Sequence, residues 1–201
     1  MIAVIDYGMG NLGSVSKALK TLGAKVRVTD ASPDLKKADK IVLPGVGAFK
    51  DAMGALNTLK LLEPLKDAIA SKKPYLGICL GLELLFEESE EGGSNKGLGI
   101  LKGGVVRFRD SHLKVPHIGW NQIKTQKPSC PLFQGIDDNS FFYFVHSYYV
   151  IPKEKDIIAA TTDYGGSFTS MVWKGNIYAV QFHPEKSQEN GIRFLENFIR
   201  L

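Results

Sequence analysis

The chain has 201 residues, of which 44% are hydrophobic and 23% are charged, and its formal net charge is +4. This composition is ordinary for one globular domain, expected to span residues 1–201, and the lack of a basic cluster with interleaved aromatic residues argues against nucleic-acid binding. The apolar runs are far shorter than a bilayer span, and the two cysteines are too few for a disulfide framework, which together predict a soluble cytoplasmic protein.

Strands and helices are expected to alternate through the first half of the chain. The apolar patterns predict strands at 2–6, 25–29, 41–43 and 74–78, and helices at 12–22, 51–62, 63–70 and 80–86. This order implies parallel βαβ units in an α/β sheet with helices on both faces. Asn11 is a suitable cap for the first helix. The preceding Gly8-x-Gly10 lacks the third glycine of a dinucleotide-binding fingerprint, so a simple loop is the preferred interpretation.

The second half of the chain is rich in short β-strands. Strands are expected at 105–108, 141–145, 157–161, 167–173 and 177–182, adding antiparallel strands to the mostly parallel sheet of the first half. The acidic run at 87–93 is expected to be a solvated loop that closes the preceding helix, rather than a metal site. A final helix at 188–201 would place Ile192, Leu195 and Ile199 on one face.

The segment Gly77-Ile78-Cys79-Leu80-Gly81 joins a predicted buried strand to a predicted helix. A nucleophile at such a turn sits on a strained backbone, and a glycine two residues to either side leaves room for the chain to pass. The positive end of the following helix dipole is expected to favour the thiolate. A lone cysteine is more often a buried core residue, but the glycine spacing and the strand–turn–helix context favour a nucleophile here.

The loop at 44–49, Pro-Gly-Val-Gly-Ala-Phe, follows the third predicted strand. Loops at the carboxyl ends of strands line the active crevice of an α/β sheet, and glycines let backbone N–H groups approach a ligand closely. The loop is therefore either part of an oxyanion hole or a simple turn into the next helix.

Four histidines are candidates for a catalytic base. His112 lies in a polar loop and is expected at the surface, while His117 and His146 flank aromatic segments as buried, hydrogen-bonded side chains or as ligands. His183 ends an apolar strand, and the Glu185 carboxylate two residues further on would point to the same side of an extended chain. A strand-end histidine is usually structural, but together with the cysteine turn this pair completes a nucleophile, a base and an orienting acid.

These segments resemble the class I, or triad, glutamine amidotransferases, whose fold is a flavodoxin-like α/β sheet. The resemblance rests on Gly-Ile-Cys-Leu-Gly at 77–81 and His-Pro-Glu at 183–185, and further matches at 6–11, 43–47, 84–87, 117–121, 143–148 and 181–187 extend it over essentially the whole chain. The Gly-Trp-Asn and His-Ser-Tyr segments are similar in particular to glutaminase subunits of imidazole glycerol phosphate synthases, which act in histidine biosynthesis.

The resemblance implies hydrolysis of L-glutamine to glutamate and ammonia without a metal or other cofactor. Cys79 would attack the side-chain amide, His183 would move the proton and Glu185 would hold the imidazole. The ammonia would pass to a (β/α)8-barrel cyclase subunit in a heterodimer. The matched family positions are the oxyanion donors Val46 or Gly47 and Leu80, the substrate-pocket residues Gly47, Glu83, Ser147 and Tyr148, and the partner-interface residues Asn11, Trp120, Tyr143 and Lys186.

Glu83 departs from the family pattern, which usually has glutamine four residues after the cysteine. Residues four apart share a helix face, so Glu83 is expected to face the pocket with Cys79. An ionised carboxylate roughly 6 Å from a thiolate would oppose it by roughly 3 kcal/mol at an effective dielectric constant near 20. Alternatively, Glu83 pairs with the substrate ammonium group, or is protonated and imitates the amide.

Two other functions compete with this prediction. The chain could supply ammonia to a different synthase, of the nucleotide-sugar or anthranilate type, with the same triad and another partner. It could also be a non-catalytic docking or regulatory subunit, with Glu83 as a mark of lost activity, although the complete set of triad residues argues against this.

Overall fold

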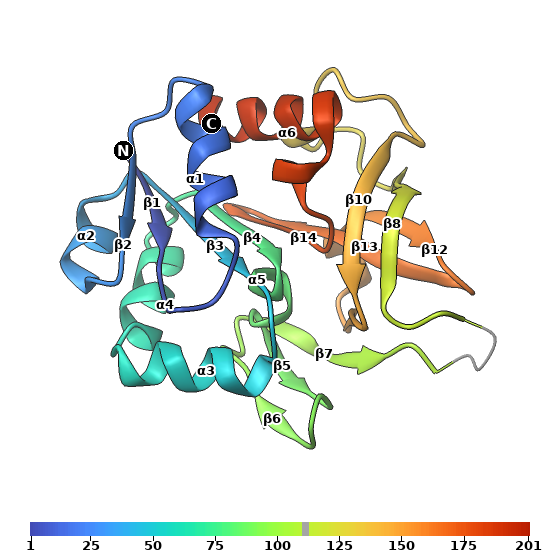
Figure 1. The fold of residues 1–201 in the computed structure, drawn as a ribbon, viewed down its shortest axis with the longest axis horizontal. Helices are drawn as coiled ribbons and strands as arrows, with labels where there is room; N and C mark the ends of the chain where they lie inside the picture. The colour runs from blue at the N-terminus through green and yellow to red at the C-terminus, as the bar shows by residue number, and fades with distance from the viewer. Residues whose placement is uncertain (110–112) are drawn as a thin grey trace.

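The computed structural model describes residues 1–109 and 113–201 and places a large β-sheet between two layers of helices (Figure 1). Five parallel strands form its first part. Their order across the sheet is β2 (Val26–Thr29), β1 (Ile2–Ile5), β3 (Lys40–Gly45), β4 (Tyr75–Cys79) and β14 (Ile177–Val180). This is the flavodoxin-like order 2-1-3-4-5 with β14 in the fifth place, so the predicted fold class is confirmed.

Helices cover both faces of this parallel part. On one face lie α1 (Leu12–Thr21) and α6 (Gln188–Arg200), and on the other lie α2 (Ser32–Lys37), α3 (Phe49–Thr58) and α4 (Leu62–Ala70) (Figure 1). Alternate strand residues supply the two cores: Val42 packs with the α1 and α6 side, whereas Leu43 packs with the α3 and α4 side. Among the residues described, no helix is long and apolar enough to cross a membrane.

The second half of the chain extends the sheet with mainly antiparallel pairs. Beyond β14 follow, in order, β13 (Ser167–Lys174), β11 (Tyr148–Pro152), β7 (Leu101–Arg107), β5 (Phe86–Ser89) and β6 (Asn95–Lys96), while β12 (Ile158–Asp163) and β9 (Lys124–Thr125) branch from β13. A separate antiparallel ribbon contains β8 (His117–Gln122) and β10 (Phe141–His146). Short 3-10 turns lie at η1 (Pro131–Phe133), η2 (Lys155–Ile157) and η3 (Pro184–Lys186).

The predicted helix at 80–86 is wrong in its second half. Helix α5 (Leu80–Glu83) is a single turn, and the strand β5 begins at Phe86, so half of the predicted acidic loop is also strand. The physical reason is that every residue from 80 to 86 is buried, which leaves no solvent-facing side for an amphipathic helix. Of this run only Phe86 belongs to β5, which continues to Ser89 and pairs with β7.

The predicted apolar face of the last helix also needs correction. Leu195 is buried as predicted and Ile199 packs partly buried against the core, but Ile192 is exposed, and Phe194 and Phe198 complete the buried face. Phe194 packs against Phe142 of β10 and against Phe182 in the segment after β14.

Candidate functional site

The site lies where three neighbouring parallel strands end. In the sheet register, Cys79 at the end of β4 is opposite Gly45 at the end of β3, and Ile78 is opposite Val180 at the end of β14. The loop that follows β3 carries Gly47, and the segment that follows β14 carries His183. Segments far apart in the sequence therefore meet at one edge of the sheet, as expected for the ligand crevice of an α/β fold.

Cys79 occupies a strained turn between β4 and α5. Its φ angle is +54°, a region that side-chain-bearing residues rarely adopt. Steric contacts impose this turn: a Cβ on Gly77 would lie 2.4 Å from the Gly81 carbonyl oxygen, and a Cβ on Gly81 would lie 1.9 Å from the Leu43 carbonyl oxygen. Both glycines are thus required for the chain to pass, as the spacing predicted.

The resting state of Cys79 differs from the prediction. Burial raises the pKa of the thiol well above its usual range, an ionised Glu83 would raise it further, and the Leu80 N–H only partly offsets the effect of burial. Because α5 is a single turn, it lacks the aligned peptides of a strong helix dipole. The site therefore holds a neutral thiol that needs a base, rather than a preformed thiolate.

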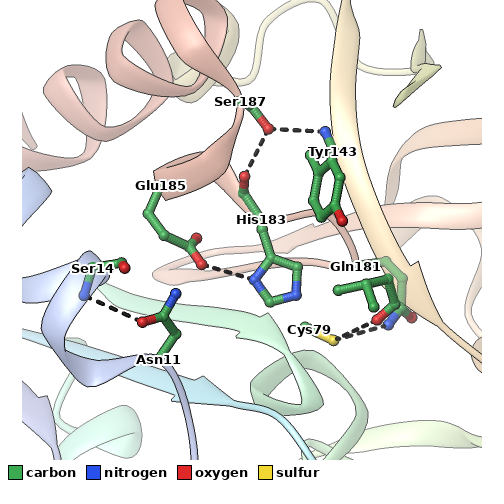
Figure 2. Close-up of polar contacts among 9 residues, drawn as sticks. Asn11, Ser14, Cys79, Tyr143, Gln181, His183, Glu185 and Ser187 are labelled. Atoms are coloured by element: carbon green, nitrogen blue, oxygen red, sulfur yellow. Dashed lines mark hydrogen bonds and ion pairs between the residues drawn. The ribbon is translucent and has the colours of Figure 1, made fainter. Parts of the chain in front are cut away.

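His183 and Glu185 form the predicted pair. The imidazole Nδ1 and the carboxylate Oε1 are 2.8 Å apart, and both side chains are almost completely buried. The two residues are brought together by the 3-10 turn η3, not by the extended chain that the sequence suggested. In Figure 2 the imidazole lies between Glu185 and Cys79, and its Nε2 has no hydrogen-bond partner among the described residues.

A buried serine attaches the turn that carries His183 to the neighbouring strand β10 (Figure 2). The Ser187 hydroxyl donates to the His183 carbonyl at 2.7 Å and accepts from the Tyr143 N–H at 3.0 Å. The His183 N–H in turn donates to the Tyr143 carbonyl at 2.9 Å. Both backbone polar groups of Tyr143 are thereby used to hold the turn of the candidate base.

A pocket of about 190 Å³ opens beside Cys79. Its lining contains every residue predicted for the oxyanion hole and the substrate pocket, namely Val46, Gly47, Leu80, Glu83, Ser147 and Tyr148. Glu91 and His146 also line it, and neither was predicted to do so. No feature distinguishes Glu91 from its neighbours in the acidic run of the sequence, because its position depends on a hydrogen bond from the Phe49 N–H to its carboxylate, at 2.7 Å.

Glu83 is buried and mainly protonated at neutral pH. Burial raises the pKa of its carboxyl group to about 8, with only partial compensation from the Gln181 side chain. The Gln181 amide nitrogen is 2.8 Å from Glu83 Oε1 and 3.8 Å from Cys79 Sγ. Of the possibilities open from the sequence, the ionised carboxylate opposing a thiolate is therefore disfavoured. Gln181 itself was missed, although its place two residues before His183 on one strand face was a usable signal.

Three of the four residues assigned to a partner interface lie together. The Trp120 and Tyr143 rings are 6.0 Å apart in an edge-to-face arrangement, and Lys186 Nζ is 5.7 Å from the centre of the Tyr143 ring. Trp120 is 45% exposed, so the group faces solvent. The fourth residue, Asn11, caps α1, and its side-chain oxygen accepts from the Ser14 N–H at 3.4 Å.

Polar atoms without partners concentrate at this site. Six buried side-chain polar atoms lack a hydrogen-bond partner within the described part of the chain, and four of them surround Cys79: Tyr7 Oη, Gln181 Oε1, His183 Nε2 and Glu185 Oε2. His117 and His146 are buried and hydrogen-bonded to each other, and His146 also lines the pocket, while His112 lies outside the described residues. No cluster suited to a metal ion occurs among the residues described.

Comparisons with known proteins agree with this geometry. The family model for glutamine amidotransferase class-I matches residues 3–201. The chain is 53% identical over 204 residues to the imidazole glycerol phosphate synthase subunit HisH of Syntrophotalea carbinolica, covering 98% of each chain. It is 52% identical over 201 residues to HisH of Methanocaldococcus jannaschii, covering 100% of each.

Solved structures show the same fold at lower identity. PurLQS from Thermotoga maritima matches with a TM-score of 0.79 and 17% identity, covering 99% of this chain and 97% of that one. The glutaminase domain of CTPS from Trypanosoma brucei matches with a TM-score of 0.67 and 18% identity, covering 99% of this chain and 93% of that one.

Proposed function

The chain belongs to the class I glutamine amidotransferase family, and we propose that it is the glutaminase subunit of an imidazole glycerol phosphate synthase, acting in histidine biosynthesis. One observation carries the proposal: a cysteine at a strained turn borders a pocket and lies beside a buried histidine–carboxylate pair (Figure 2), in a chain about half identical to HisH over its full length. The reaction is hydrolysis of L-glutamine to glutamate and ammonia.

The first half of the proposed reaction forms a thioester. His183 Nε2 takes the proton from the Cys79 thiol as sulfur attacks the side-chain amide carbon of glutamine. The negative charge that develops on the amide oxygen is met by backbone N–H groups of Val46 or Gly47 and of Leu80. The imidazolium, held by Glu185, then returns the proton to the departing nitrogen, and ammonia leaves.

The second half releases glutamate. Water attacks the γ-glutamyl thioester while His183 takes its proton, and the same oxyanion donors stabilise the second tetrahedral intermediate. The proton then returns to the Cys79 sulfur as the carbon–sulfur bond breaks. Because the resting thiol is neutral, the base is needed in both halves, which explains why the imidazole is so firmly oriented.

The pocket wall suits an amino acid. The Glu91 carboxylate supplies a negative charge for the α-ammonium group, while Ser147 and Tyr148 supply polar groups on the opposite segment. A protonated Glu83 carries a donor and an acceptor, as an amide does, so it takes the place of the usual glutamine without adding charge beside the thiol.

The exposed face of the ribbon β8–β10 is the proposed docking surface for the (β/α)8-barrel cyclase subunit. Ile118 and Trp120 of β8 lie opposite Val145 and Tyr143 of β10, and together they form an apolar face next to the site. Ammonia released beside Cys79 would pass directly into the docked partner of this heterodimer. A single domain over residues 1–201 and a cytoplasmic location, where both free cysteines stay reduced, complete the proposal.

Glutamate release tests the proposal, measured both for the isolated chain and in the presence of the cyclase with its nucleotide ligand. Cys79→Ala should abolish release, whereas Cys130→Ala, at the other buried free cysteine, should retain it. A wild-type chain that releases no glutamate in either condition would refute the enzyme and favour a docking role. Release that responds to a different synthase would refute the partner.

A further inference from the structure

We propose that His117 and His146 are positioning residues that fix the Ser147–Tyr148 wall of the substrate pocket through a chain of hydrogen bonds. The inference rests on the proposed function only in taking this pocket as the glutamine site. Neither histidine takes part in the mechanism above, and both belong to the two segments that distinguish this chain within its family.

The hydrogen bonds assign one proton position to each ring. His146 Nδ1 is 2.7 Å from the Tyr148 carbonyl oxygen, which only accepts, so His146 carries its proton on Nδ1. Its Nε2 is 2.9 Å from His117 Nδ1. Burial lowers the pKa of His146 to about 3 and that of His117 to about 4, so both rings are neutral at pH 7. His146 Nε2 is therefore an acceptor, and His117 Nδ1–H is the donor.

Asn121 completes the chain at its other end. The free nitrogen of His117, Nε2, is 3.3 Å from the Asn121 amide nitrogen, which donates to it. The same amide group also donates to the Asp163 carbonyl at 2.9 Å and accepts from the Gln122 N–H at 2.8 Å, so its orientation is determined independently. The chain thus runs from Asn121 through both rings to the Tyr148 carbonyl with every donor matched to an acceptor.

Aromatic packing prevents the rings from turning. His117 is stacked between Tyr164, at 3.9 Å between ring centres, and Phe144, at 5.0 Å. His146 lies 5.3 Å from Phe108 in an edge-on arrangement. A ring held on both faces keeps its nitrogens aimed at fixed partners, which is what a positioning role requires.

The pair stands where the ribbon meets the pocket. His117 and His146 face each other in the register of β8 and β10, and the next two residues form the connection to β11 that lines the pocket. The preceding Val145 carbonyl is 3.9 Å from Cys79 Sγ. The bond from His146 to the Tyr148 carbonyl joins the start of β11 to the end of β10.

Two substitutions at one position separate hydrogen bonding from packing. In His117→Asn the amide nitrogen can take the place of Nδ1–H and donate to His146, whereas His117→Leu removes the donor and keeps an apolar side chain. Asn197→Ala is a control, because Asn197 is a buried amide with two backbone hydrogen bonds on α6, away from the pocket. It should lower the melting temperature without changing substrate recognition.

The first readout is catalysis by the complex with the cyclase subunit. His117→Leu should raise the KM for glutamine about tenfold with a smaller change in kcat, as expected for loss of one positioning hydrogen bond. His117→Asn should keep the KM close to the wild-type value. Equal KM values for wild type and His117→Leu would overturn the proposal. A wild type without glutaminase activity would instead refute the proposed function.

The second readout does not depend on turnover. The rate at which Cys79 is labelled by the glutamine analogue 6-diazo-5-oxo-L-norleucine should fall in His117→Leu, while its labelling by iodoacetamide stays the same. Nitrogen-15 spectra of the wild type should show both histidines as Nδ1–H tautomers. A parallel fall in both labelling rates, or Nε2–H tautomers, would mean that the pair serves only general stability.

Discussion

The nucleophile and the base are held in place by different physical means. Cys79 sits on a turn defined by backbone contacts, with Gly77 and Gly81 packed so closely against neighbouring carbonyl groups that no side chain fits. His183 sits on a turn defined by hydrogen bonds: its ring donates to Glu185, its N–H donates to the Tyr143 carbonyl, and its carbonyl accepts from the Ser187 hydroxyl. One position is fixed by repulsion and the other by attraction.

This difference predicts how each turn responds to substitution. Repulsion at short distance rises steeply, so the nucleophile turn should respond to substitution in an all-or-none way. Hydrogen bonds contribute about 1 kcal/mol each, so the base should lose its position by degrees. The turn that carries the base is hydrogen-bonded to β10, the strand that contributes to the proposed docking surface. The turn that carries the nucleophile is buried in the parallel part of the sheet.

The largest effect is expected from Gly81→Ala. Its Cβ would lie 1.9 Å from the Leu43 carbonyl oxygen, so β3 or α5 must move, and the free energy of unfolding should fall by more than about 4 kcal/mol. Gly54→Ala, in α3 with open space around the added atom, should instead gain about 0.5–1 kcal/mol. Urea unfolding of both variants provides the measurement. Similar small changes in the two would contradict the steric account of the turn.

An intermediate effect is expected from Ser187→Ala. It leaves the Tyr143 N–H and the His183 carbonyl without their side-chain partner, and a loosened base should lower kcat about tenfold with little change in KM. Ser71→Ala, which removes only a local bond to the Ala68 carbonyl, is the matched control and should leave kcat unchanged. Equal kcat values for wild type and Ser187→Ala would show that the Glu185 contact alone orients the imidazole.

Glu83→Gln tests the residue that lies between the two turns. The folded pKa of about 8 is above the ordinary value of 4.5, so this carboxyl group stabilises the fold relative to glutamine at low pH and loses that contribution as pH rises through 8. Between pH 4.5 and 8, the free energy of unfolding of the wild type should fall by up to about 1.4 kcal/mol per pH unit relative to that of Glu83→Gln. Denaturant unfolding from pH 5 to 9 measures this difference. Glutaminase efficiency should be kept or raised, and a hundredfold loss in kcat/KM would show that the carboxylate is required.

The smallest effect is expected from Lys186→Met. Lys186 contacts Tyr143 within the same chain, so removing its ammonium group should loosen the proposed docking surface and weaken cyclase binding by no more than about fivefold, the value of one exposed cation–π contact. Lys127→Met removes an equivalent contact with Trp173, at 5.5 Å, outside the proposed docking surface and should not change the Kd. Calorimetric titration with the cyclase subunit compares the two variants. Equal Kd values would place the docking surface elsewhere.

Strands β1, β3 and β4 of the parallel part were readable from the sequence because each is a short, buried apolar run. Helix α2 was not predicted, because its six residues are too few to show a helical period. The antiparallel part was harder, and β8 and β11 were not predicted: β8 mixes polar and apolar residues, and β11, Tyr-Tyr-Val-Ile-Pro, has no apolar–polar alternation. Helix α5 was misjudged because a fully buried run has no periodicity by which a helix differs from a strand.

The site residues also divide into those that could be identified from local sequence and those that could not. The Gly-x-Cys-x-Gly spacing and the His-Pro-Glu segment carry their chemistry locally, so Cys79, His183 and Glu185 could be identified before the fold was known. Glu91 could not, because its position depends on a contact with Phe49, far away in the sequence, whereas Gln181 was missed although its place two residues before His183 was a usable signal. The neutral resting thiol was also hidden, since burial around Cys79 is a property of the packed fold rather than of the sequence near it.

The four buried polar atoms without partners around Cys79 set a limit on how stable this protein can become. Each such atom forgoes about 1–3 kcal/mol that an apolar or fully bonded replacement would recover. Selection for heat resistance alone would therefore fill these positions first and remove the groups that handle the proton. A screen for stabilising substitutions should yield inactive variants at these residues, and a thermophilic relative must gain its stability somewhere else in the fold.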